Sequence, residues 1–233
     1  MVNEAASRIL QCLQSVAEQR ALRAADAGLA ARVREIKRYQ HTRFATTYAD
    51  LLSSPRYARA AQFFLDDLYG PGDFSARDDQ FARIVPGLTR LFPHEIVETV
   101  RALGELHALS ERLDTAMGRV ITDFPEGQLL DAASYGRAWR DVGEPELREQ
   151  QISLMLAVGS ALDRYTRNPL LRHSLRLMRA PAHAAGLGAL QSFLENGFDT
   201  FRQMRGATEF LATIATRERE LAVRLFADKE SGA

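Results

Sequence analysis

Apolar residues recur every three or four positions along almost the whole chain, which is the spacing of an amphipathic α-helix. No segment shows the strict alternation of apolar and polar residues that is typical of a half-buried β-strand. The helical pattern is longest over residues 4–20, 27–53, 94–122, 146–167 and 207–226. The sequence therefore predicts an all-α fold, a compact multi-helix bundle of about nine helices.

Prolines and glycines mark where several helices should begin or end. Pro55, Pro169 and Pro181 suit first-turn positions, since a residue there has no use for its backbone N–H. Gly70 and Pro71 should end the helix that Pro55 begins. The helices that begin at Pro169 and Pro181 are expected to end near residues 179 and 205, and a short helix is expected near 131–141.

Two of the expected helices look central because their side chains are apolar or small all round. The segment 152–162 reads ISLMLAVGSAL, and the segment 181–194 reads PAHAAGLGALQSFL. A helix that is apolar on every side is expected to be covered on every side. We therefore expect two central apolar helices wrapped by amphipathic ones.

The chain is expected to form one helical domain over residues 1–226, with a frayed tail over 227–233. An internal boundary, if one exists, should fall near 123–130, where DFPEGQ interrupts the pattern. The N-terminus lacks the apolar core of a secretory signal, and no apolar run approaches the length of a membrane span. Cys12 is the single cysteine, which fits a reducing compartment. We expect a cytoplasmic protein that does not enter a membrane.

Charge excludes one class of partner and suggests another. The formal net charge is zero, which argues against a protein that binds nucleic acid by neutralising many phosphates. Arginines are nonetheless concentrated near one helix, at Arg164, Arg167, Arg172, Arg176 and Arg179. This face could hold an anionic ligand or an acidic protein partner. The alternative is a solvated face paired with nearby glutamates.

The segment 63–81, FFLDDLYGPGDFSARDDQF, gathers five aspartates around a Gly-Pro-Gly corner. Carboxylates can hold a cation, but their spacing does not match a calcium loop. The alternative is a joint between two helices, in which Ser75 and Asp78 form a capping box and Arg77 holds a carboxylate in bidentate fashion. We favour the structural corner, which comprises Asp67, Gly70, Pro71, Asp73, Ser75, Arg77 and Asp78.

A polar group interrupts the apolar stripe of the longest helix. His107, Glu111 and Asp114 follow i, i+4, i+7 spacing and share one face, with Ser110 between them. Such a face could be a buried acid–base site or half of a zinc or non-haem iron site. A haem site would instead need an axial histidine, for which His41 and His183 are the candidates. The alternative is a histidine satisfied at a helix interface, and only a structure can show whether His107 borders a cavity.

Three stretches resemble a family of uncharacterised bacterial proteins. They are RYARAAQFFLDDLYGPGDFSARDDQFARIVPGLTRLFP, ELHALSERLD and GLGALQSFLENGFDTFRQMRGA, and the element FFLxDLYGPxDFxxRD is the most distinctive. The resemblance implies a bacterial cytoplasmic setting, and it carries no activity, cofactor or catalytic residue over to this chain.

No nucleotide-binding, hydrolase or zinc-protease motif is present in the sequence. The leading hypothesis is therefore a non-catalytic binding or interaction module that uses the arginine face. The alternatives are a helical haem- or metal-dependent enzyme using His107, Glu111 and Asp114, and a regulatory protein that binds an apolar metabolite between its helices. A homodimer is expected only because twofold oligomers are common.

Overall fold

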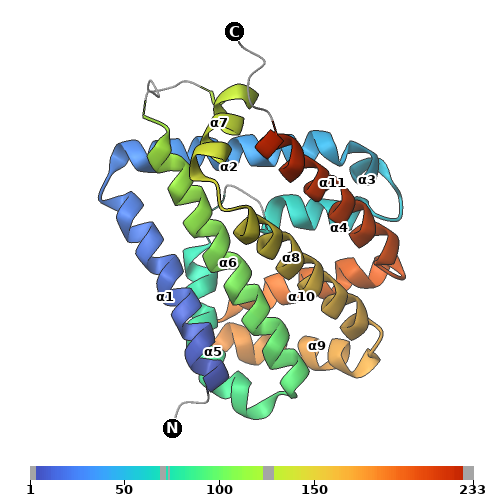
Figure 1. Cartoon of the computed structure of the whole chain (residues 1–233). Helices are drawn as coiled ribbons and strands as arrows, with labels where there is room; N and C mark the ends of the chain where they lie inside the picture. Colours follow the sequence, from blue (N-terminus) through green and yellow to red (C-terminus); the bar gives the residue numbers. More distant parts are fainter. Residues whose placement is uncertain (1–3, 69–71, 73, 123–128, 228–233) are drawn as a thin grey trace.

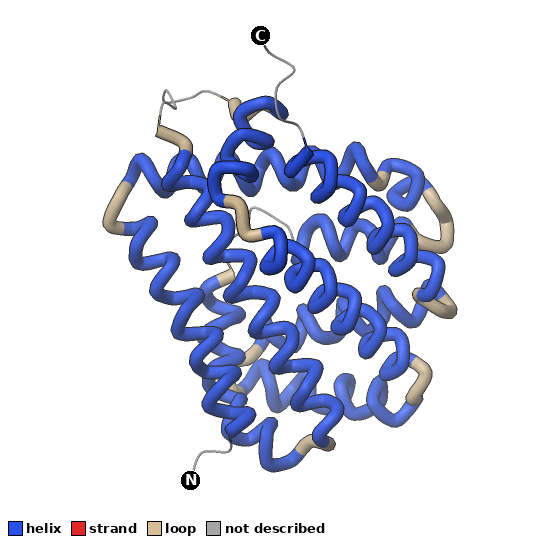
Figure 2. The backbone as a smooth tube through the Cα atoms, in the orientation of Figure 1, coloured by secondary structure: helices blue, strands red, loops and turns tan. Residues whose placement is uncertain are grey.

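The computed structural model describes residues 4–68, 72, 74–122 and 129–227, and every regular element in these residues is helical (Figure 2). This confirms the all-α prediction, with eleven α-helices among the described residues where about nine were expected. The elements are α1 (Glu4–Ala24), α2 (Ala27–Thr47), α3 (Ala49–Ser53), α4 (Ala58–Phe63), the π-helical turn η1 (Phe64–Leu68), α5 (Ser75–Leu91), α6 (His94–Val120), α7 (Ala132–Val142), α8 (Pro145–Thr166), α9 (Pro169–Ala184), α10 (Gly188–Met204) and α11 (Thr208–Ala227).

The longest helix, α6, runs through the middle of the molecule. It contacts α1, α2, α7 and α8, and Figure 1 shows it between α1 and α8. Its C-terminal half is the most deeply buried part, because Leu113, Asp114, Thr115, Met117 and Gly118 are all buried. Helix α6 therefore lies in the interior of the bundle, with these four helices packed against it.

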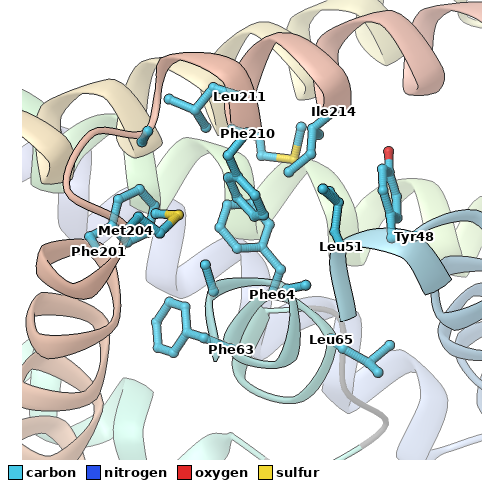
Figure 3. Packing of buried hydrophobic residues seen from close by; sticks show 14 of the residues in the cluster. Tyr48, Leu51, Phe63, Phe64, Leu65, Phe201, Met204, Phe210, Leu211 and Ile214 are labelled. Carbon is cyan, nitrogen blue, oxygen red and sulfur yellow. The ribbon is translucent and has the colours of Figure 1, made fainter. Parts of the chain in front are cut away.

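The largest hydrophobic cluster joins the short helices α3 and α4 to α8, α10 and α11. Phe64 lies at its centre, with ring centroids 6.2 Å from Phe201 and 5.4 Å from Phe210. Figure 3 shows Met204 and Ile214 approaching from the two C-terminal helices. Burial of one such aromatic or aliphatic side chain stabilises the fold by roughly 1.5–3 kcal/mol. The cluster thus anchors α10 and α11 on the α4 segment.

The helix expected over 27–53 is interrupted at Tyr48, which separates α2 from α3. Tyr48 has φ −113° and ψ 24°, outside the helical region. Its side chain is fully buried, and its hydroxyl donates to Glu218 Oε1 of α11 at 2.8 Å. The helix breaks where Tyr48 makes this tertiary contact. Glycine and proline, which are common causes of a break, do not lie near the tyrosine.

The expectation of two central apolar helices is wrong in both cases. In α8, Ser153, Ala157 and Ser160 are exposed, so this helix has a solvent face. The segment 181–194 is not one helix, because α9 continues through Pro181 and ends at Ala184. Gly186 follows with φ 70°, a left-handed conformation that suits glycine and stops the helix.

Several other boundaries differ or lie outside the described residues. Helix α4 begins at Ala58, after a turn that contains the expected start at Pro55. The expected stop at Gly70 and Pro71, most of the boundary segment 123–130 and most of the tail 227–233 lie outside the described residues. Within the described part of the chain, no helix combines the length and the apolar character that a membrane crossing requires.

Candidate functional site

A cavity of about 190 Å³ lies inside the bundle along the inner side of α6. The residues of α6 that line it extend from Val100 to Asp114, which is about 20 Å along the axis at about 1.5 Å per residue. Other walls come from α5 and α10, and from α2 and α7, which lie near the top of the view in Figure 1. The small volume spread over this length makes the space long and narrow.

One end of the cavity is apolar and the other is polar. The apolar end lies between α5, α10 and the N-terminal half of α6, and its residues include Phe81, Ile84, Leu88, Val100, Leu103 and Leu190. The polar end lies between α2, α7, α8 and the C-terminal half of α6, and its residues include Lys37, Gln40, Glu111, Asp114, Tyr135 and Arg148. The cavity is therefore amphipathic along its length.

His107 borders this cavity and is also held by a neighbouring side chain. Its Nε2 lies 2.8 Å from Oδ2 of Asp78 on α5, and Arg20 Nη2 of α1 donates to the same oxygen at 2.6 Å. Burial tends to raise the pKa of Asp78, but the hydrogen bond with His107 and the nearby positive groups outweigh it and lower that pKa. The group joins three helices, so the carboxylate of Asp78 is an ionised structural anchor at the cavity wall.

Glu111 lies next along the same face and is neutralised by two cations. Arg23 Nη2 of α1 and Lys37 Nζ of α2 each lie 2.5 Å from one of its carboxylate oxygens. Burial would raise the pKa of Glu111, but the charges of Lys37 and Arg23 lower it. Glu111 is thus an ionised carboxylate whose charge is already compensated.

Asp114 is the third member of the row and, like Glu111, is buried. Gln40 Nε2 of α2 donates to its Oδ1 at 2.9 Å. Burial raises the pKa of Asp114; the charge of Lys37 opposes the rise and that of Glu111 reinforces it. Its carboxyl therefore takes up a proton more readily than an ordinary aspartate does.

Arg148 of α8 is a site residue that the sequence analysis missed. Its side chain stacks on the Trp139 ring, with Cζ 3.7 Å from the ring centroid, and only 2% of the residue is exposed. Nη2 donates to the sulfur of Met117 at 3.2 Å, and Nη1 lies 3.5 Å from Oε1 of Gln151. Within the described part of the chain, no carboxylate oxygen lies within 4.0 Å of this guanidinium.

The buried donors Arg148 Nε and Trp139 Nε1 have no acceptor among the described residues. A signal for Arg148 does exist in the sequence. It precedes Ile152 and Met155 at i, i+4, i+7 spacing and so lies on the buried stripe of α8. A charged residue on such a stripe is a candidate functional residue.

The structure does not arrange the predicted ligands as a metal or haem site. Among the described residues there is no group of three or more His, Cys, Asp or Glu side chains that could hold a metal ion. His107, Glu111 and Asp114 are instead engaged by separate partners. His41 and His183 do not line the cavity, and His183 is exposed at the end of α9.

The arginine face lies along α9 and is largely matched by acidic neighbours. Arg172 Nε donates to Asp199 Oδ1 at 3.1 Å, Arg167 pairs with Asp163 at 2.5 Å, and Arg179 pairs with Glu195. Arg164 and Arg176 are exposed. The geometry therefore corresponds to the paired, solvated alternative for most of these arginines, and none of them lines the cavity.

The corner that was expected around residues 67–78 is described only in part, because Gly70, Pro71 and Asp73 lie outside the described residues. The cap position of α5 is Phe74, without a side-chain cap hydrogen bond, so Ser75 is the first helical residue and the expected capping box is wrong.

Among the described residues, Arg77 does not form the expected bidentate pair with a carboxylate. Its Nη1 donates to the backbone oxygen of Asp67 at 3.1 Å, and its Nε lies 3.6 Å from Asp78. Its guanidinium lies over the rings of Phe74 and Phe193, 4.3 and 4.5 Å from their centroids. Arg77 is therefore held between two aromatic rings, and Oδ2 of Asp78 is already bound by Arg20 and His107.

Comparison with known proteins gives a family for the chain. A family model described as a domain of unknown function, DUF8198, matches residues 19–232. No curated protein and no solved structure matches the chain. The matched range contains the FFLxDLYGPxDFxxRD element and every cavity residue except Leu13. The chain belongs to the DUF8198 family, to which no activity is assigned.

Proposed function

We propose that this chain is a binding protein that holds one small amphipathic molecule inside its helical bundle. The observation that carries the proposal is the narrow cavity along α6, with an apolar end and a polar end. An apolar cavity of about 150 Å³ suffices to bind benzene, so about 190 Å³ can take a small organic molecule of roughly ten non-hydrogen atoms. Concave sites with apolar walls and a few polar groups are typical of ligand pockets.

This proposal develops the third of the sequence-based hypotheses, in which an apolar metabolite binds between helices. The arginine face of α9 supports partner binding less well, because Arg172 and Arg179 already have acidic partners. Surface ion pairs of this kind contribute little energy, and the acidic partners reduce the positive field that an anionic partner would meet.

A titration with 1-octanol tests the proposal, because this neutral molecule needs only the apolar part of the cavity. Octanol should raise the melting temperature of the wild-type protein, since a ligand that binds only the native state stabilises it. Leu103→Trp places a larger side chain in the cavity and should abolish the shift. Leu177→Trp changes an exposed leucine of α9 and should keep it. A shift that survives in Leu103→Trp would contradict the proposal.

One observation favours a second candidate, acid–base catalysis by His107, because Asp78 orients this imidazole at the cavity wall. Ser110 does not complete a nucleophilic pair, since its hydroxyl donates to Leu106 O and accepts from Gln151. Mass spectrometry of the small molecules that co-purify with wild type and with His107→Gln separates the two functions. The same molecule in both supports binding, and a substrate that accumulates only in the variant supports catalysis.

A further inference from the structure

We infer that the molecule bound in this cavity is a linear carboxylate, with its carboxylate on Arg148 and its chain lying along α6 toward Leu103 and Leu190. The inference rests on the proposed function and adds the chemical class of the ligand. Its basis is the combination of one buried cation that has no carboxylate in direct contact among the described residues with a narrow apolar channel.

The charge of Arg148 is the first step of the argument. A guanidinium stays protonated in proteins and carries five N–H donors. Arg148 donates to the sulfur of Met117 at 3.2 Å, but a thioether is a weak acceptor, and its contact with Gln151 is long, at 3.5 Å. Its Nε has no acceptor among the described residues. A buried charge without a carboxylate in direct contact is costly, so an anion would be bound strongly here.

The other cations at the polar end of the cavity are differently placed. Lys37 contacts Glu111, a carboxylate that it shares with Arg23, and Arg43 donates to Glu218 at 2.6 Å. Both cations thus have a carboxylate in direct contact, which Arg148 lacks among the described residues. Arg148 is therefore the cation at this end whose charge an incoming anion would balance.

The donors around Arg148 match a carboxylate in number and type. Trp139 Nε1 is a second buried donor without an acceptor among the described residues, and its ring stacks on the guanidinium. A carboxylate offers two oxygens and about four lone-pair sites, which is enough acceptors for donors of both Arg148 and Trp139. A neutral hydroxyl would satisfy one donor and leave the charge uncompensated.

The shape of the cavity selects the rest of the molecule. The contact with Met117 places Arg148 beside the C-terminal half of α6, beyond the polar row. From there, the lining along α6 runs through Ser110 and His107 to the apolar residues Leu103 and Val100. A volume of about 190 Å³ over roughly 20 Å suits a single extended chain better than a flat ring system.

Three probes of equal chain length test this inference in calorimetric titrations at neutral pH: octanoate, 1-octanol and octylamine. We expect the wild-type protein to bind octanoate at least tenfold more tightly than octanol, and octylamine most weakly. Arg148→Met should reduce octanoate affinity to that of octanol and leave octanol binding unchanged. Arg32→Met is the control, because Arg32 donates to Gly118 O at the surface of α6 and does not line the cavity.

The outcomes separate the inference from the function on which it rests. Equal binding of octanol and octanoate by wild type would overturn the carboxylate assignment and leave the proposed function standing. Absence of binding by all three probes would overturn both. If Arg148→Met does not fold, the comparison of the three probes on wild type still decides the question, and Arg148→Lys, which keeps the charge without the fork, should bind octanoate with intermediate affinity.

Discussion

His107 Nε2 of α6 lies 2.8 Å from Oδ2 of Asp78 on α5, and this contact ties together two helices at the wall of the cavity. Arg20 of α1 reaches the same oxygen, so one carboxylate connects three helices. The arrangement keeps the wall in place around the space that we assign to the ligand.

Replacement of Asp78 by alanine should therefore be strongly destabilising. The change leaves Arg20 and His107 without their shared acceptor in a half-buried site, and loss of one partner from a buried ion pair costs roughly 3–5 kcal/mol. Asp50→Ala is the matched control, because Asp50 pairs with Arg217 at an exposed position and such pairs contribute about 0–1 kcal/mol. Urea unfolding measures both free energies, and an equal loss in the two variants would show that the Asp78 group is not an anchor.

Asp114→Asn should be more stable than the wild-type protein, by a difference that grows as the pH rises. The pKa of Asp114 is raised in the folded state, so between the unfolded value near 3.9 and the folded value the native protein binds more protons than the unfolded chain. The stabilisation that Asp114 gives the wild-type protein is complete below that window and is lost as the pH rises through it. Asparagine keeps an oxygen that accepts from Gln40 and has no carboxyl proton, so the variant does not lose this stabilisation. The measurement is the urea midpoint of both proteins from pH 4 to pH 8.

Glu111→Gln should show the opposite dependence. The pKa of Glu111 is lowered in the folded state, so its stabilisation is present above the unfolded value near 4.3 and is lost as the pH falls through the folded value. The variant should be less stable than wild type at pH 7, and the difference should shrink in acid. The same sign of pH dependence for the two variants would contradict the assigned environments.

Two glycines of α6 should respond differently to alanine. A Cβ at Gly118 would lie 2.7 Å from Val33 Cγ2, whose β-branched side chain has little freedom to move, whereas one at Gly104 would lie 3.5 Å from Cys12 Cβ, an ordinary contact. Gly118→Ala should cost about 1–3 kcal/mol. Gly104→Ala should gain up to about 1 kcal/mol from helix propensity. Thermal unfolding of both variants checks this, and equal effects would mean that α2 and α6 are not closely packed.

Much of the fold could be predicted from the sequence, because its helices bury apolar stripes at regular spacing. Helix α6 was expected over 94–122 and extends from His94 to Val120. The break at Tyr48 could not be predicted, since it accompanies a contact with Glu218 of α11 and involves no glycine or proline. Pro181 was expected to begin a helix, but α9 continues through it to Ala184, and Gly186 follows in a left-handed conformation that ends the helix.

The candidate site was only partly visible in the sequence. The shared face of His107, Glu111 and Asp114 was readable, because helical spacing alone places them together. The partners that determine their chemistry, such as Asp78 and Lys37, lie far away in the sequence and are brought near by packing. Arg148 was overlooked among the chain's many arginines, although it lies on the buried stripe of α8.

The most direct test is a crystal structure of the protein with 8-bromooctanoate, in which the anomalous signal of bromine locates the end of the chain. The account predicts a bromine peak inside the bundle, in the cavity along α6, with the carboxylate beside Arg148 and the bromine on the side of the carboxylate that faces Leu103. A peak found only on the outer surface, for example beside the exposed Leu177 of α9, would contradict it.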